Sequence, residues 1–437
     1  MKKIINSILI GAAVLGLSSC SLHDDTELFG EPAAERLEKA VAADKALLES
    51  ASNGWELHLW TGKEYSAGGY TYFMKFANDK VTVSSDIAPA TMKTTSSYDV
   101  ISDQGPVLTA NTFDEIFHYL AQPSMDDDDG EQQDYEFVIM RTTNDSIYLR
   151  GKKWGNHMVM TRVAESTSWE DEINKIQQMD NDLMRTFALV EGNDTLGNVS
   201  LSDDRILTFK NKSGGYKKIP YYVSTKGITL AKPLEVNSKS MQELTYNADD
   251  MSLNPVEATA QGLKLGVLVP ENYMKYAEFA GDYNMTTNWG ASKLTLHLVP
   301  AGDGKTYLLK GMNANYDLTL TYDKATGALN LNTQHLLDYN GYQLWLCPWR
   351  VLDGTGTFTW ATSAGMVLSR DLSKTGTVLK FDPNDYSGLT PDSFILVLFS
   401  GAPSNSTFVG SAKGISALYI RPGDYRLVGP STMTKIN

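Results

Sequence analysis

Four aromatic residues in the C-terminal half have the chemistry of a ligand platform. They are Trp289, Tyr342, Trp345 and Trp349, and the last three stand together in DYNGYQLWLCPW, 338–349. Because side chains alternate along a strand, Trp345 and Trp349 are expected on one face. A flat pair of indoles there could stack on the CH-rich face of a sugar ring. The alternative is that these residues form the core of a barrel, since aromatic side chains dominate buried surfaces.

The acidic segment MDDDDGEQQDYE, 125–136, has part of the spacing of a calcium-binding loop. With Gly130 at the sixth position of an EF-hand loop, Asp127, Asp129 and Glu136 fall on ligand positions. The first position is then Met125, which cannot ligate calcium, and the flanking residues predict loop and strand instead of two helices. We expect a solvated acidic loop, leave open whether residues 126–129 bind calcium, and predict no metal site.

The usual catalytic motifs are missing. The chain has no His-Glu-x-x-His, no Ser-x-x-Lys and no Gly-x-Ser-x-Gly. A pair of carboxylates could hydrolyse glycosides, but 52 acidic residues offer too many pairs to choose from. No His/Met spacing indicates haem ligation. We predict that the protein is not an enzyme and carries no cofactor.

Cys20 is the residue with the clearest covalent chemistry. Lys2 and Lys3 precede an apolar run of signal-peptide length, 4–17, which ends in Leu17-Ser18-Ser19-Cys20. This ending resembles a bacterial lipobox, which is cut just before the cysteine. The resemblance implies that the Cys20 sulfur carries a diacylglycerol, with palmitate-type chains anchoring the protein to a membrane. The alternative is an ordinary secretory signal with a chance cysteine.

The residues after Cys20 are acidic. The segment 23–27, HDDTE, resembles the export signal that sends Bacteroidetes lipoproteins to the outer face of the outer membrane; the alternative is a solvated tether. We expect a signal peptide at 1–19 and a tether at 20–30. Cys347 then has no disulfide partner and is expected to be a buried apolar residue.

The net charge of the chain indicates which kinds of partner it can bind. The 437 residues carry a formal net charge of −14. Proteins that bind nucleic acid concentrate positive charge, so this balance argues against a nucleic-acid partner.

Hydrophobic periodicity predicts a mainly β chain with two helices in its N-terminal half. Helices are expected at 31–52 and from Ser168 to about Phe187, each followed by short alternating strands. We read 98–113 and 221–236 as a degenerate internal repeat; the alternative is that any two β-meanders look alike. From about Tyr276, evenly spaced strands predict a lipocalin-like β-barrel or a sandwich. The expected organisation is a helix-plus-meander unit at 31–165, a second at 166–272, and a barrel-like domain at 273–437.

Most of the chain also resembles a known family, and the first half does so most specifically. NGWELHLW, GGYTYFMKF, SSYDVISDQGPVLTANTFDEIFHY, DYEFVIM and LRGKKWGNHMVMTRV resemble a family of Bacteroidetes outer-membrane lipoproteins catalogued as a domain of unknown function. The resemblance implies a lipid-anchored protein of the outer membrane, exposed on the cell surface and associated with TonB-dependent nutrient uptake. It implies no catalytic or ligand-binding residues.

Three functions remain open. The first is a non-catalytic accessory protein of an outer-membrane uptake system that binds a glycan, a peptide, haem or a partner receptor. The second is a structural or adhesive surface protein, which predicts that there is no pocket and that all eight tryptophans are buried. The third is a hydrolase with an unrecognised site.

Overall fold

The computed structural model describes residues 32–103, 105–110, 112–123, 128–352, 354–384 and 386–436. Cys20, the signal peptide, the tether, and Asp126 and Asp127 of the acidic loop lie outside these residues. The chain divides into two compact units, Met1–Leu183 with Leu189–Leu265, and Met184–Ala188 with Gly266–Asn437. Within the described ranges, no helix is long and apolar enough to cross a membrane.

The first unit begins with helix α2 (Ala33–Glu49), which is shorter at both ends than predicted. The Trp55 indole donates to the carbonyl of Leu48 over 2.9 Å and ties the helix end to the first strand. Gly54 has φ +78, and a Cβ there would lie 2.5 Å from the Met74 carbonyl oxygen, so the turn after the helix requires glycine.

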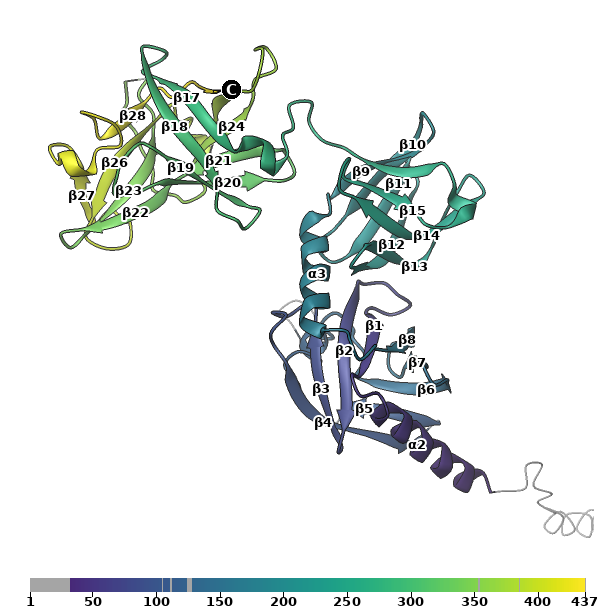
Figure 1. Ribbon diagram of the computed structural model, residues 1–437. Coiled ribbons are helices and arrows are strands. Elements are labelled where there is room, and N and C mark those ends of the chain that lie inside the picture. Colours follow the sequence, from purple (N-terminus) through teal and green to yellow (C-terminus); the bar gives the residue numbers. More distant parts are fainter. Residues whose placement is uncertain are drawn as a thin grey trace, which may run out of the picture. The chain divides into compact units, whose positions relative to one another are not determined.

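Eight antiparallel strands follow α2 and close into a barrel because β1 pairs with both β2 and β8 (Figure 1). They are β1 (Trp55–Trp60), β2 (Gly69–Ala77), β3 (Lys80–Ser85), β4 (Thr94–Ser102), β5 (Pro106–Ala110), β6 (Glu136–Thr142), β7 (Ser146–Gly151) and β8 (His157–Arg162). Their inward side chains form one apolar core, on which Leu48 of α2 packs.

Helix α3 (Trp169–Asp182) begins where the sequence predicts and ends earlier. Ser168 is the N-cap, and its hydroxyl accepts the backbone N–H of Asp171 over 3.2 Å. Leu183 is already extended, and Phe187 lies in a strand. The predicted end was wrong because Leu183 and Phe187 are four residues apart, as on a helix, whereas the buried residues from Phe187 onward alternate with a period of two.

A second closed barrel of eight antiparallel strands follows α3 (Figure 1). Its strands are β9 (Thr186–Glu191), β10 (Asp194–Leu201), β11 (Ile206–Asn211), β12 (Tyr216–Ser224), β13 (Gly227–Val236), β14 (Lys239–Asn247), β15 (Ser252–Pro255) and β16 (Leu263–Val267).

The two barrels share one plan, a helix followed by eight strands that close on themselves. The two halves of the suspected repeat are the hairpins β4–β5 and β12–β13, which are the fourth and fifth strands of their barrels. Their leading tyrosines, Tyr98 and Tyr221, are both buried. This equivalence supports an internal repeat.

Charged and aromatic side chains join these two barrels within the first unit. The Arg205 guanidinium donates to the buried Asp86 carboxylate over 2.7 Å and to the Gly69 carbonyl over 3.0 Å. The second terminal nitrogen of the guanidinium lies 3.3 Å from a carboxylate oxygen of Asp180 on α3. The imidazole of His58 stacks on the ring of Tyr222, with centroids 4.0 Å apart and planes 10° apart.

The second unit contains a third closed barrel of eight strands and a separate five-stranded sheet (Figure 1). The barrel strands are β17 (Gly281–Thr287), β18 (Ser292–Pro300), β19 (Thr306–Lys310), β20 (Leu318–Asp323), β21 (Ala328–Asn332), β24 (Gly365–Arg370), β25 (Val378–Pro383) and β29 (Thr432–Lys435). The sheet strands are β22 (Gln334–Tyr339), β23 (Tyr342–Trp349), β26 (Ser393–Phe399), β27 (Phe408–Ser411) and β28 (Arg426–Val428). Short 3-10 turns lie at Tyr119–Ala121, Ala258–Ala260, Tyr276–Phe279, Tyr386–Gly388 and Ser416–Leu418.

The C-terminal half contains this sheet and two irregular segments in addition to the predicted barrel. The aromatic segment 342–349 lies in the sheet, outside the closed barrel. GTFTWATS, 356–363, is a loop with one isolated bridge, Trp349 to Phe358. Gly354 and Gly356 have positive φ, which breaks the extended run. ALYIRPG, 417–423, also forms no named strand; its start belongs to the last 3-10 turn.

Candidate functional site

Trp345 and Trp349 share one face of β23, as the alternation of side chains predicts. Trp345 pairs with Val397 and Trp349 with Ser393 on β26. The opposite face carries Leu344 and Leu346, which join the barrel core. The two indoles therefore lie on the face that points away from that core.

The outward face of this sheet forms a small cluster of its own. Cys347 is fully buried there with Val397 and Phe399, and the half-buried Trp345, Phe358 and Trp360 pack around them; Ile395 completes the set. Burial raises the pKa of the Cys347 thiol to about 12, so it stays protonated and unreactive. The Trp345 indole packs beside His335 at 5.5 Å and donates to Gln343 over 3.2 Å.

Tyr342 lies apart from the two tryptophans. It starts β23 directly after the turn at Asn340 and Gly341, both of which have positive φ, and it is exposed. Its even position gives its side chain the opposite direction from Trp345. The structure therefore does not assemble the four predicted aromatic residues into one platform.

Trp289 stands alone at the turn between β17 and β18. Its φ is +51, following Asn288 with the same value, and for a bulky residue a positive φ is an outlier that the surroundings must enforce. The backbone N–H groups of Asn288 and Trp289 donate to the carbonyls of Val428 and Gly429 over 2.7 and 3.2 Å. The indole remains 51% exposed.

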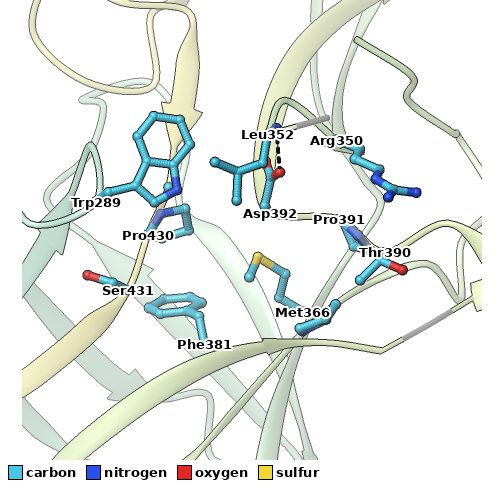
Figure 2. A pocket seen from close by; sticks show the side chains of 12 residues that line it. Trp289, Arg350, Leu352, Met366, Phe381, Thr390, Pro391, Asp392, Pro430 and Ser431 are labelled. Atoms are coloured by element: carbon cyan, nitrogen blue, oxygen red, sulfur yellow. Dashed lines mark hydrogen bonds between the residues drawn. The ribbon is translucent and has the colours of Figure 1, made fainter. Parts of the chain in front are cut away.

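Trp289 borders a pocket of about 570 Å³ (Figure 2). The pocket lies where the ends of β24, β25 and β29 meet the ends of β23, β26 and β28. Its lining combines apolar side chains with a few polar ones. The lining residues are Trp289, Arg350, Leu352, Met366, Phe381, Pro383, Thr390, Pro391, Asp392, Gly429, Pro430 and Ser431.

A chain of hydrogen bonds ties the two walls of the pocket together. Asp392 accepts the backbone N–H groups of Val351 and Leu352, the latter over 2.8 Å and drawn in Figure 2. Asp392 also accepts the Ser393 hydroxyl over 2.8 Å, and that hydroxyl oxygen accepts the N–H of Gly429 over 3.1 Å. The carbonyl of Gly429 then holds Trp289. Asp392 therefore fixes the pocket's shape, because its own oxygens are occupied by the protein.

Most of this pocket was missed by sequence reasoning. Only Trp289 was among the predicted residues. The others come from several segments between 350 and 431 with no common spacing, and Leu352, Met366 and Phe381 look like any apolar residue in a strand or loop. The one available signal was Asn288-Trp289-Gly290, where a large aromatic residue occupies a tight turn.

One carboxylate in the described part of the acidic loop is paired within the protein. Asp129 forms an ion pair with Lys153 at 2.8 Å. Among the described residues, no group of three or more His, Cys, Asp or Glu side chains is arranged to hold a metal ion.

Two models of protein families match the chain. Residues 25–248 match the domain of unknown function DUF4302, and residues 256–397 match a second domain of unknown function, DUF4987. Because the first match covers more than half of the sequence, the chain belongs to the DUF4302 family. The predicted resemblance to a family of unknown function is confirmed, and no catalytic family is indicated.

Other comparisons add little. The search of curated proteins gave no match. Among solved structures, the chain is similar to a mutant of the vaccine antigen transferrin-binding protein B from Haemophilus parasuis, at 7% identity over 88% of this chain and 75% of that one. The TM-score is 0.12, so this likeness carries no argument.

Proposed function

We propose that this protein is a lipid-anchored lipoprotein of the outer-membrane surface that binds its ligand without catalysis, as an accessory component of a nutrient-uptake system. The observation that carries the binding role is Trp289, an exposed indole held in a strained turn on the rim of a pocket of about 570 Å³. Strain of this kind persists where a fixed side-chain position is useful.

A sugar ring is the ligand that this pocket suits best. The indole face offers a flat apolar surface for the CH groups of a pyranose, and Arg350 and Thr390 supply polar groups on the rim. Apolar floors with a few orienting polar groups are typical of small-ligand sites. A TonB-dependent receptor is the proposed partner, and the net charge of −14 argues against nucleic acid.

The membrane anchor in this proposal is Cys20, supported by the lipobox-like Leu17-Ser18-Ser19-Cys20 and the acidic residues that follow. The alternative of a structural or adhesive spacer predicts eight buried tryptophans and no pocket. The exposure of Trp289 and the pocket beside it favour the binding role.

Saturation-transfer NMR with the purified chain tests the binding role, using maltohexaose, cellohexaose and laminarihexaose as probes. At least one of them is expected to bind, and Trp289→Ala should weaken its affinity about tenfold or more, since loss of a well-stacked aromatic contact costs on the order of 1.4 kcal/mol. Tyr342→Ala is the matched control, because this exposed aromatic residue lies off the pocket. Equal affinity in wild type and Trp289→Ala for every probe would remove the basis of the proposal.

A further inference from the structure

A second pocket lies on the first barrel, at the foot of the long loop between β5 and β6. It has a volume of about 320 Å³, within the size range of small-ligand sites. Its lining residues are Gln133, Asp134, Tyr135, Glu136, Lys152 and Lys153. None of these contributes to the pocket at Trp289.

Gln133 is the first sign that this pocket takes a ligand. Its side chain is 2% exposed, and its amide nitrogen donates to the Phe117 carbonyl. Its amide oxygen is buried and has no hydrogen-bond partner among the described residues. An unsatisfied buried acceptor costs free energy, so a lining residue of this kind indicates a missing donor.

The frame around Gln133 is rigid. Asp134 is 2% exposed, and its carboxylate accepts the backbone N–H groups of Lys153 and Trp154 over 2.7 and 3.1 Å. The carboxylate packs directly on Gly151, where a Cβ would lie 1.9 Å from it. The pocket is therefore preformed.

The charges that line the pocket balance one another. Asp134 and Glu136 carry two negative charges, and Lys152 and Lys153 carry two positive charges. Lys152 bridges Glu136 at 3.2 Å and Asp103 at 2.9 Å. Lys153 pairs with Asp129 at 2.8 Å, and Asp134 is satisfied by backbone N–H groups. With each of these charges already satisfied, the pocket favours a neutral ligand over a free cation or anion.

A row of three rings, the exposed Tyr135 and Phe113 with the half-buried His118 between them, extends from the pocket. Tyr135 lies 5.4 Å from His118, and His118 stacks on Phe113 at 5.6 Å with planes 28° apart. Tyr135 is 43% exposed and Phe113 is 66% exposed. The Nδ1 atom of His118 accepts the backbone N–H of Asp114 over 3.0 Å, so the neutral ring carries its proton on Nε2, an additional donor in the row.

We infer that this pocket and its ring row form a second ligand site, which binds a neutral oligosaccharide. Hydroxyl groups both donate and accept, so they can satisfy the Gln133 oxygen and accept from the lysines at once. The CH faces of successive sugar rings can stack on Tyr135, His118 and Phe113. The inference does not rest on the function proposed for the pocket at Trp289.

The test uses the purified chain carrying Trp289→Ala, so that the other pocket contributes no stacking. Saturation-transfer NMR is run with maltohexaose, cellohexaose and laminarihexaose, and with tetraglycine as a neutral peptide probe. At least one oligosaccharide should bind. Adding Tyr135→Ala, Phe113→Ala or Gln133→Met should weaken that binding at least fivefold, with the melting temperature measured for each variant.

Tyr216→Ala is the matched control, since Tyr216 is an exposed tyrosine on β12 outside both pockets; it should leave the binding unchanged. Because Tyr135 and Phe113 are exposed, their variants keep the test decisive even if Gln133→Met does not fold. Three results would overturn the inference: no oligosaccharide binding in the Trp289→Ala chain, binding that survives Tyr135→Ala, or binding of tetraglycine alone.

Discussion

At the scale of single residues, Gly429 is what allows Trp289 to stand on the pocket rim. A Cβ on Gly429 would lie 2.7–2.8 Å from three atoms of the indole, and the glycine has φ +47. Gly429→Ala should displace the indole, lower the free energy of unfolding by about 1–3 kcal/mol and abolish binding at this pocket.

Gly414→Ala is the matched control for this prediction. Gly414 also has a positive φ, +86, but nothing lies within 4 Å of its added Cβ. Gly414→Ala should therefore lower the free energy of unfolding only through the strained backbone, by about 1 kcal/mol. Urea denaturation of both variants separates the backbone cost of the positive φ from the cost of the clash with the indole. Equal losses in the free energy of unfolding would contradict the steric role of Gly429.

His58 gives the first unit a pH dependence. Burial lowers the pKa of its imidazole from 6.5 to about 4. Between pH 6.5 and 4 the unfolded chain therefore binds more protons than the folded one, so stability falls as the pH falls through this window. The His58 contribution reaches at most about 3 kcal/mol near pH 4, at 1.36 kcal/mol per pKa unit.

Burial raises the pKa of the neighbouring Glu56, which acts in the opposite direction. The His58 effect is therefore measured by comparing wild type with His58→Gln. The free energy of unfolding of each is determined by urea denaturation at pH 7.5 and at pH 4.5. The wild type should lose more stability between these values than the variant. Parallel losses would contradict the assignment.

At the scale of elements, the ion pair between Arg205 and Asp86 joins the first two barrels. Both side chains are buried, so Arg205→Met leaves an unpaired carboxylate and should cost about 3–5 kcal/mol. Restoring neutrality with Asp86→Leu in the same chain should recover much of the loss. Lys175→Met, which breaks an exposed pair with Glu172, should change the urea midpoint little. If Arg205→Met behaves like that control, the pair does not hold the junction.

Some of the helices and strands could be predicted from the sequence, and others could not. The start of α3, the alternating strands and the buried Cys347 follow local rules of capping and periodicity. The end of α3 did not, because Leu183 and Phe187 fit a helical and a strand pattern equally well. The second sheet was also missed, since pairing of β23 with β26 joins residues that lie 44 or more positions apart and share no local signal.

At the scale of the whole molecule, three closed eight-stranded barrels follow one another along the chain. The first two share a helix-first plan, and the similar segments 98–113 and 221–236 begin in equivalent strands of the two barrels. The candidate sites could not be predicted in the same way. The pocket at Trp289 lies between ends of barrel strands and ends of the second sheet, and the pocket at Gln133 lies beside the paired strands β6 and β7. Trp289 and Glu136 are the lining residues that the sequence singled out.

The proposed surface anchoring through Cys20 matters for the whole molecule, because both pockets need access to external ligands. Protease shaving of intact cells, followed by immunoblotting, tests it most directly. We expect the wild-type protein to be degraded on intact cells and Cys20→Ala to be released into the medium. A protein that stays membrane-bound but protected until the cells are lysed would face the periplasm, and would contradict the account.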